Sequence, residues 1–329
     1  MYLITTNDKR KVMNKLLIIS KEKEKYLSLF ECSDLPDLEI CHDLRKADII
    51  LADPPLIKDL LDQCERVEWL QSTFAGIDVL VDPHLKQDYE LTNVKGIFGQ
   101  QISEYVLGYC IQHFRHFTQY AQQQHKKQWL PHDYISLSNK TMVILGTGSI
   151  GCSLAITAKA LGFTVYGINR SGIPPKESPF KQVFHITEIN TAFKQADVIA
   201  STLPKTDQTI GLLNTEILSH GNGALLFSVG RGEILDNYGL LHSLENKTIS
   251  HAFLDVFMNE PLSQECPYWH HPNITVTPHI AAVSFPEQVF EQFSINYLRW
   301  RDGFSLLNLI DFDIRVLKNH KACKFTGFK

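Results

Sequence analysis

The 329-residue sequence has no apolar run that approaches the ~18 to 20 residues needed to cross a bilayer. The residues before Met13 also lack the apolar segment of a secretory signal peptide, and Met13 is a second candidate start of the chain. Charge of one sign is not in excess, because 32 basic and 36 acidic residues leave a net charge of −4. A nucleic-acid partner would need a clustered basic surface, which this balance of charge does not indicate. We therefore expect a soluble protein that binds small ligands.

Cysteine is scattered, and none of the seven residues belongs to a Cys-x-x-Cys pair. An odd, unpatterned set of this kind is typical of reduced thiols in a cytoplasm and not of a disulfide framework. The adjacent His270 and His271 would point apart, and no carboxylate stands at a metal-ligand spacing from them. We therefore expect a cytoplasmic protein without a metal site.

The chain is long for a single domain, since domains average roughly 150 residues. Short β-rich runs alternate with longer amphipathic stretches, which is typical of βαβ units and parallel sheets. Strands are predicted at 16–19, 48–51, 67–70 and 90–93, then at 141–145, 164–168, 197–200, 224–227, 251–254 and 274–277. One helix is predicted from about 101 to 124 between the two blocks, and another from about 284 to 300. The prediction is an α/β protein of two Rossmann-like domains, the first of them discontinuous (1–98 and 284–329) and the second continuous (99–283).

A G-x-G-x-x-G string that starts at Gly146 directly follows the 141–145 strand pattern and opens a helical pattern. That context makes the string a strong dinucleotide signal, whereas the string alone would be weak. Glycine allows the tight turn and the close approach of a pyrophosphate, which the helix N-terminus then attracts. The predicted pyrophosphate-binding residues are Gly146, Gly148, Ser149, Ile150 and Gly151.

The sequence lacks a carboxylate where an NAD site would have one, at the end of the second strand of this domain. That position has Asn169, Arg170 and Ser171 instead. An acid there would repel a 2′-phosphate, whereas an arginine and a serine can bind one through hydrogen bonds. The three residues are predicted to bind the cofactor, with NADPH preferred and NADH as the alternative.

Three ionisable residues stand just beyond predicted strands of the second block. Arg231 lies between two glycines, Glu260 precedes a proline, and His279 follows the sequence Thr-Pro. Since open parallel sheets bind ligands at the carboxyl ends of their strands, these side chains are expected to converge. Taken singly, each residue could equally belong to an ordinary turn.

The order of these motifs resembles the D-isomer-specific 2-hydroxyacid dehydrogenase family, and within it the glyoxylate/hydroxypyruvate reductases. The likeness runs from about 16 to 311 and includes LQSTFAGID at 70–78, ISEY at 102–105 and LPKT at 203–206. The resemblance implies that the first domain (1–98 and 284–329) is a flavodoxin-like substrate domain and that 99–283 binds the dinucleotide. It also implies reduction of a small 2-oxo acid to a D-2-hydroxy acid.

The resemblance further implies a role for each residue, which the chemistry of the side chains supports. Arg231 would hold the substrate's carboxylate and carbonyl oxygen through its planar fork. His279 would pass a proton to that oxygen, and Glu260 would orient the imidazole and favour its protonated form. Further expected contacts are substrate binding by Ala75 and Gly76, a nicotinamide contact by Asp255, and a cofactor cleft lined by Leu203, Pro204, Thr209 and Val229.

Trp129 resembles a residue that in relatives reaches the neighbouring subunit, which favours a homodimer; the alternative is a tryptophan buried at a helix end. Two other functions stay open. One is an NAD-dependent dehydrogenase of another substrate, such as formate or phosphoglycerate. The other is a nucleotide-sensing corepressor of the same fold, although no extended partner-binding segment is evident.

Overall fold

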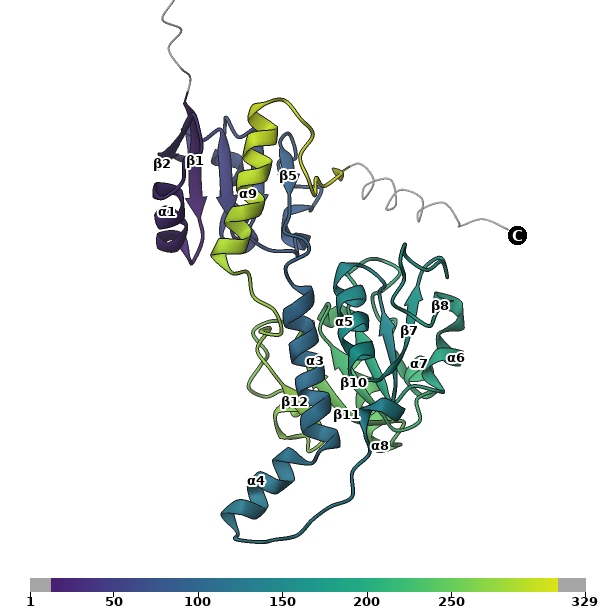
Figure 1. Cartoon of the computed structure of the whole chain (residues 1–329). Helices are drawn as coiled ribbons and strands as arrows, with labels where there is room; N and C mark the ends of the chain where they lie inside the picture. Colours follow the sequence, from purple (N-terminus) through teal and green to yellow (C-terminus); the bar gives the residue numbers. More distant parts are fainter. Residues whose placement is uncertain (1–12, 313–329) are drawn as a thin grey trace, which may run out of the picture. The chain divides into compact units, whose positions relative to one another are not determined.

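The computed structural model describes residues 13–312, which form two compact units (Figure 1). One unit combines the described residues up to Lys95 with those from Ser284 onward, and the other is Gly96–Val283. Both are α/β units with parallel sheets, which confirms the predicted fold class. The substrate and dinucleotide roles given to the units stay predictions. Whether residues 1–12 are an extension concerns a segment outside the described residues.

The first unit contains a five-stranded parallel sheet in the order β2-β1-β3-β4-β5. The sequence pattern missed β2, because the strand is only four residues long and a glutamate interrupts its apolar residues. The strands are β1 (Asn14–Ile19), β2 (Leu38–Cys41), β3 (Ile49–Ala52), β4 (Trp69–Ser72) and β5 (Glu90–Thr92). The helices are α1 (Lys23–Glu31), α2 (Pro54–Ile57) and α9 (Pro286–Arg301).

An aromatic cluster attaches α9 to this sheet. The fully buried Trp69 stacks on Phe293 of α9 with ring centroids 4.9 Å apart, and Phe30 of α1 meets Phe293 edge-on at 5.1 Å. The indole N–H of Trp69 donates to Thr92 Oγ1 at 2.8 Å, so its polar atom is satisfied inside the core. The helix predicted after 284 therefore belongs to the first unit, which makes that unit discontinuous in sequence.

The second unit contains a seven-stranded parallel sheet in the order β12-β11-β10-β9-β6-β7-β8. The prediction of six strands is wrong by one, because it omits β8, a short edge strand with two apolar residues. The strands are β6 (Thr141–Leu145), β7 (Thr164–Asn169), β8 (Gln182–His185), β9 (Val198–Ser201), β10 (Ala224–Ser228), β11 (Ile249–Leu254) and β12 (Ile274–Val276). The strand order reverses beside β6, where doubly wound sheets bind ligands.

Helices cover both faces of this sheet (Figure 1). Alternate residues of β6 show the two layers, since Met142 and Ile144 pack with α3 and α5 while Val143 and Leu145 pack toward α6, α7 and α8. A strand buried on both faces explains the continuous apolar run of β6. The helices are α3 (Gly99–Phe114), α4 (Phe117–His125), α5 (Ser149–Ala160), α6 (Ile189–Phe193), α7 (Thr215–Leu218) and α8 (Asn237–Glu245).

The single helix predicted from 101 to 124 is two helices, α3 and α4. His116 has a left-handed φ of 56°, which a continuing right-handed helix cannot contain. At the start of α3, the side-chain amide of Gln101 donates to the carbonyl of Val283 and accepts from its N–H, at 3.0 and 2.9 Å. The residues at which the chain enters and leaves the second unit are thereby held together. Within residues 13–312, no helix combines the length and the apolar character that a membrane span requires.

Two histidines pack in the second unit. The rings of His113 and His251 lie 5.9 Å apart, and His251 Nε2 is 2.9 Å from Thr275 Oγ1. Burial, and then the nearness of His113 and His271, lowers the pKa of His251 to about 4. Burial, and then His116, also lowers the pKa of His113. Both rings are therefore uncharged in the folded protein at neutral pH.

We predict that mild acid destabilises the fold through these rings. An unfolded histidine titrates near pH 6.5, so between about pH 6.5 and 4 the unfolded chain binds more protons than the folded chain. The free energy of unfolding should keep its full value above about pH 6.5 and fall below it, by at most about 1.4 kcal/mol per pH unit for His251 alone. In urea titrations, His251→Gln should flatten this slope and the exposed His42→Gln should not. Equal slopes in the wild type and in His251→Gln would contradict the prediction.

Candidate active site

The glycine turn between β6 and α5 has the geometry of a backbone cradle. Gly146 has a φ of 99°, which favours glycine, and its N–H bonds to the carbonyl of Ile168 at 2.9 Å. A Cβ at Gly151 would overlap the carbonyl oxygen of Gly146, so α5 begins in direct backbone contact with the turn. A Cβ at the exposed Gly148 would meet open space. The turn therefore leaves accessible backbone at a helix N-terminus, which fits a pyrophosphate.

The side chain of Asn169 organises the loop that follows β7. Its amide donates to Thr147 Oγ1 at 2.9 Å and to the carbonyl of Ile173 at 2.8 Å. Its carbonyl oxygen accepts from the N–H groups of Ser171 and Gly172 at 3.1 and 2.7 Å. Asn169 thus ties this loop to the glycine turn, and a direct contact with the cofactor stays a prediction.

Arg170 and Ser171 occupy the exposed part of this loop. The hydroxyl of Ser171 accepts from the N–H of Ile173 at 3.2 Å, so part of its bonding capacity serves the loop itself. The loop therefore presents an arginine close to the dinucleotide turn, as a 2′-phosphate site would need.

The loop after β9 is held by a threonine hydroxyl. Thr209 Oγ1 donates to the carbonyl of Pro204 at 2.7 Å and accepts from the N–H of Thr206 at 2.8 Å. Lys205 in the same loop pairs with Glu233 at 2.6 Å, which connects it to the loop after β10. The predicted cofactor residues Leu203, Pro204 and Thr209 thus share one braced loop.

The two glycines beside Arg231 allow its backbone to pass between neighbouring loops. A Cβ at Gly230 would overlap the backbone of Leu203, and a Cβ at Gly232 would overlap the backbone of Phe257. Arg231 is therefore fixed between the loops that follow β9 and β11, and its guanidinium donates to the carbonyl of Gly230 at 2.8 Å. The nearby Val229 is half-buried after β10.

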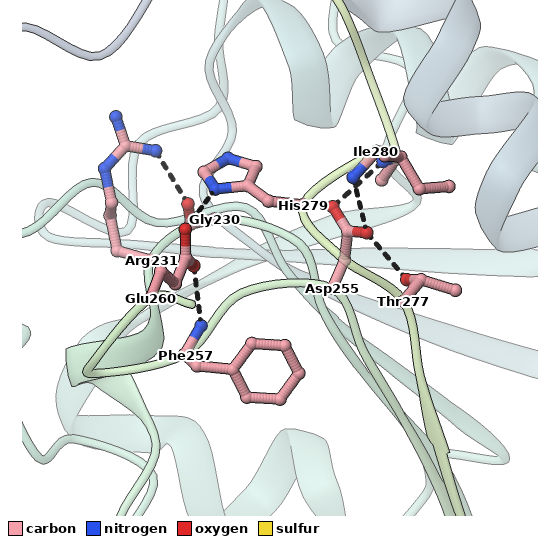
Figure 2. Close-up of polar contacts among 9 residues, drawn as sticks. Gly230, Arg231, Asp255, Phe257, Glu260, Thr277, His279 and Ile280 are labelled. Carbon is pink, nitrogen blue, oxygen red and sulfur yellow. Dashed lines mark hydrogen bonds and ion pairs between the residues drawn. The ribbon is translucent and has the colours of Figure 1, made fainter. Parts of the chain in front are cut away.

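Glu260 and His279 form a hydrogen-bonded pair (Figure 2). Nδ1 of the imidazole lies 2.8 Å from Glu260 Oε2, and Glu260 Oε1 accepts from the N–H of Phe257 at 2.9 Å. The imidazole is 49% exposed, so its other nitrogen, Nε2, can meet a ligand. A carboxylate on Nδ1 fixes the ring orientation and leaves Nε2 to donate or accept a proton.

Asp255 holds the loop that contains His279, as Figure 2 shows. Its carboxylate accepts from the N–H groups of Ile280 and Ala281 at 2.8 and 2.9 Å and from Thr277 Oγ1 at 2.6 Å, and its carbonyl accepts from the N–H of His279 at 2.9 Å. His279 has a left-handed φ of 54°, a conformation that costs a non-glycine residue about 1–3 kcal/mol. Asp255 is 1% exposed. Its expected contact with the nicotinamide stays a prediction.

The predicted substrate residues Ala75 and Gly76 lie in the first unit, in the loop after β4. The amide of Asn93 donates to the carbonyl of Ala75 at 2.7 Å, and the N–H of Val94 donates to the carbonyl of Phe74 at 3.2 Å. The residues after β5 therefore hold the shape of this loop. Substrate binding by Ala75 and Gly76 stays a prediction.

The second unit thus brings Arg231, Glu260 and His279 together on the loops that follow β10, β11 and β12 (Figure 2), while the predicted substrate residues belong to the first unit. Two hydroxyl groups that support this arrangement were not predicted from the sequence: Thr277 donates to Asp255, and Tyr105 lies 2.7 Å from Thr277 Oγ1. A hydroxyl beside apolar residues does not indicate its own partner. Among the described residues, no group of three or more His, Cys, Asp or Glu side chains is arranged to hold a metal ion.

Residues 107–281 match the family model described as D-isomer specific 2-hydroxyacid dehydrogenase, NAD binding domain. The chain is 34% identical over 281 residues to glyoxylate/hydroxypyruvate reductase A of Serratia proteamaculans, covering 82% of this chain and 88% of that one. Its fold is similar to the crystal structure of a D-isomer specific 2-hydroxyacid dehydrogenase family protein from Aeromonas salmonicida. For that pair the TM-score is 0.88 and the identity 40%, over 92% of this chain and 100% of the other.

A further similar structure is the D-isomer specific 2-hydroxyacid dehydrogenase of Xanthobacter autotrophicus in complex with NADPH and MES. Its TM-score is 0.81 and its identity to this chain 25%, over 92% of this chain and 99% of the other. Family model, curated relative and solved structures thus agree on one family.

Proposed function

The chain belongs to the D-isomer-specific 2-hydroxyacid dehydrogenases, which are NAD(P)-dependent oxidoreductases, and on that premise we propose that it reduces a small 2-oxo acid with NADPH. Glyoxylate and hydroxypyruvate are the proposed substrates, after the name of the Serratia relative. The observation that carries the proposal is the Glu260–His279 pair beside Arg231, in the unit that holds the glycine turn.

Arg231 is the proposed substrate anchor. Its guanidinium is planar and always charged, so it can meet a carboxylate and the neighbouring carbonyl oxygen at the same time. The backbone contacts of Gly230 and Gly232 fix the position of its Cα. Holding the carbonyl in one orientation reduces the entropy that must be lost in the reaction step.

His279 is the proposed proton donor. When bound, the nicotinamide supplies a hydride to the carbonyl carbon. The negative charge that grows on the carbonyl oxygen takes a proton from Nε2 of His279, and Glu260 stabilises the charged form of the ring before the proton leaves. Reversal of the same transfer would oxidise a 2-hydroxy acid.

We predict that His279→Ala lowers kcat/KM for glyoxylate and hydroxypyruvate by about 10²- to 10⁴-fold, because a positioned general acid contributes that much. The dissociation constant of NADPH, measured by fluorescence, should change little, since His279 lies on the loop after β12 and not in the glycine turn. Glu260→Gln keeps the shape of the pair but removes the charge, so it should give a smaller loss. The exposed His270→Ala is the matched control. Turnover of His279→Ala near the wild-type rate would exclude the proton-transfer role.

The proposed NADPH preference rests on the loop after β7. Arg170 is exposed there, the loop contains no carboxylate between 169 and 173, and Asn169 braces it against the glycine turn. The Xanthobacter structure contains NADPH, which agrees with this assignment.

Arg170→Asp should lower the ratio of kcat/KM for NADPH to that for NADH by about tenfold or more, because one charge-assisted hydrogen bond contributes about 1.5–3 kcal/mol. The measurement is steady-state kinetics with both cofactors and one saturating 2-oxo acid. Lys176→Asp makes the same change of charge at another exposed position nearby and should leave the ratio almost unchanged. A ratio that Arg170→Asp leaves at its wild-type value would disprove the 2′-phosphate assignment.

We also propose a homodimer, formed through the segment that follows α4. Trp129 is 95% exposed, so the alternative of a buried tryptophan is wrong for the single chain. Leu130, Tyr134 and Ile135 are each more than half exposed, and a hollow of about 580 Å³ lies between α4 and this segment. Apolar side chains gathered in this way are typical of an interface.

We predict that Trp129→Ala raises the dimer dissociation constant by about 30-fold or more, the loss expected for an interface hot spot. Sedimentation velocity over a range of protein concentrations measures it. Trp269→Ala removes a partly exposed tryptophan from another surface and should not weaken the dimer. A wild-type chain that stays monomeric at tens of micromolar would contradict the proposal.

A further inference from the structure

A chain of hydroxyl groups connects α3 to the loop of the catalytic histidine. The hydroxyl of Tyr105 lies 2.7 Å from Thr277 Oγ1, and Thr277 Oγ1 donates to Asp255 Oδ1 at 2.6 Å. A threonine hydroxyl has a single proton, and here the carboxylate takes it. Tyr105 must therefore be the donor to Thr277. The hydrogen bonds thus all point one way, from tyrosine to threonine to aspartate.

The aspartate at the end of this chain determines where His279 lies. Three consecutive N–H groups, those of residues 279, 280 and 281, bond to atoms of Asp255. These bonds hold His279 at its φ of 54°, which no local preference favours. Because the carboxylate is buried and makes several bonds at once, a small rotation would alter all of them together.

Tyr105 has the properties of a fixed donor. Its ring meets Tyr109 edge-on at 5.0 Å, and Tyr109 in turn packs on Phe253 of β11 at 4.8 Å. Burial raises the pKa of the Tyr105 hydroxyl, so it keeps its proton at neutral pH. Packing alone would not require a hydroxyl here, since phenylalanine fills nearly the same volume.

We propose that Tyr105 is a positioning residue for catalysis, which acts through Thr277 and Asp255 to orient His279 toward Glu260. This inference rests on the proposed function only in that His279 is taken as the proton donor. The hydroxyl of Tyr105 donates to the Thr277 oxygen, and this bond fixes the direction in which the threonine proton points. The direction of that proton holds the Asp255 carboxylate in the rotamer that binds residues 280 and 281.

The test compares Tyr105→Phe with Tyr109→Phe. Both changes remove a hydroxyl from α3, but the hydroxyl of Tyr109 makes no hydrogen bond to any described residue. Tyr105→Phe should lower kcat by about three- to tenfold, the loss expected for one hydrogen bond, with the KM for NADPH unchanged. Thr277→Val should lower it at least as far, and Thr277→Ser should restore it. In the Thr277→Val background, adding Tyr105→Phe should cause no further loss, because both changes break the same chain.

A second measurement does not depend on turnover. In ¹³C-histidine NMR spectra, with the His279 signal assigned through His279→Ala, the titration midpoint of His279 in Tyr105→Phe should move from the wild-type value toward that of Glu260→Gln. Tyr109→Phe should titrate like the wild type. A Tyr105→Phe enzyme with wild-type kcat and a wild-type midpoint would overturn the proposal, even if its melting temperature falls. If the wild type turns over no 2-oxo acid but the midpoint moves as expected, the positioning role of Tyr105 is supported and the proposed substrate class is wrong.

Discussion

The parallel direction of all seven strands in the second unit is the constraint on which its chemistry depends. Because the strands run the same way, their carboxyl ends share one edge, and the loops there come from segments far apart in sequence. The dinucleotide turn, Arg231, Glu260 and His279 each follow a different strand at that edge. From Gly146 to His279 they span more than a hundred residues of the chain, yet each lies on a loop directly after its strand.

Close contacts between backbone segments fix the positions of the loops at that edge. The carbonyl of Gly146 touches the start of α5, and the two glycines around Arg231 press on Leu203 and Phe257. His279 is the opposite case, because it bears a side chain in a conformation that suits glycine. The hydrogen bonds of Asp255 offset that strain, so the imidazole is already oriented before a ligand arrives.

The sequence was most informative where function demands a particular residue in a particular context. The glycine turn, the arginine between glycines and the histidine after Thr-Pro stood out because each combines a distinctive residue with the end of a predicted strand, and the structure places each of them after a strand. The short edge strands β2 and β8 were missed, since four residues each give too weak a pattern, and pairing with a neighbouring strand decides whether they form. The break at His116 escaped notice because the apolar periodicity continues across it. The contacts of Asn169 with Thr147 and Ile173, and that of Tyr105 with Thr277, could not be predicted, because only the folded chain brings these partners together.

The pairing of Gln101 with Val283 has a topological meaning. It joins the entry and the exit of the second unit, so that unit is an insertion whose two ends meet at one point. An inserted segment of this kind can be gained or excised without disturbing the host sheet, because its ends already span almost no distance. The first unit is accordingly built from two segments of the chain, and α9 packs on its sheet through the stacking of Phe293 on Trp69. A two-part enzyme can therefore arise from one chain without a second start or stop.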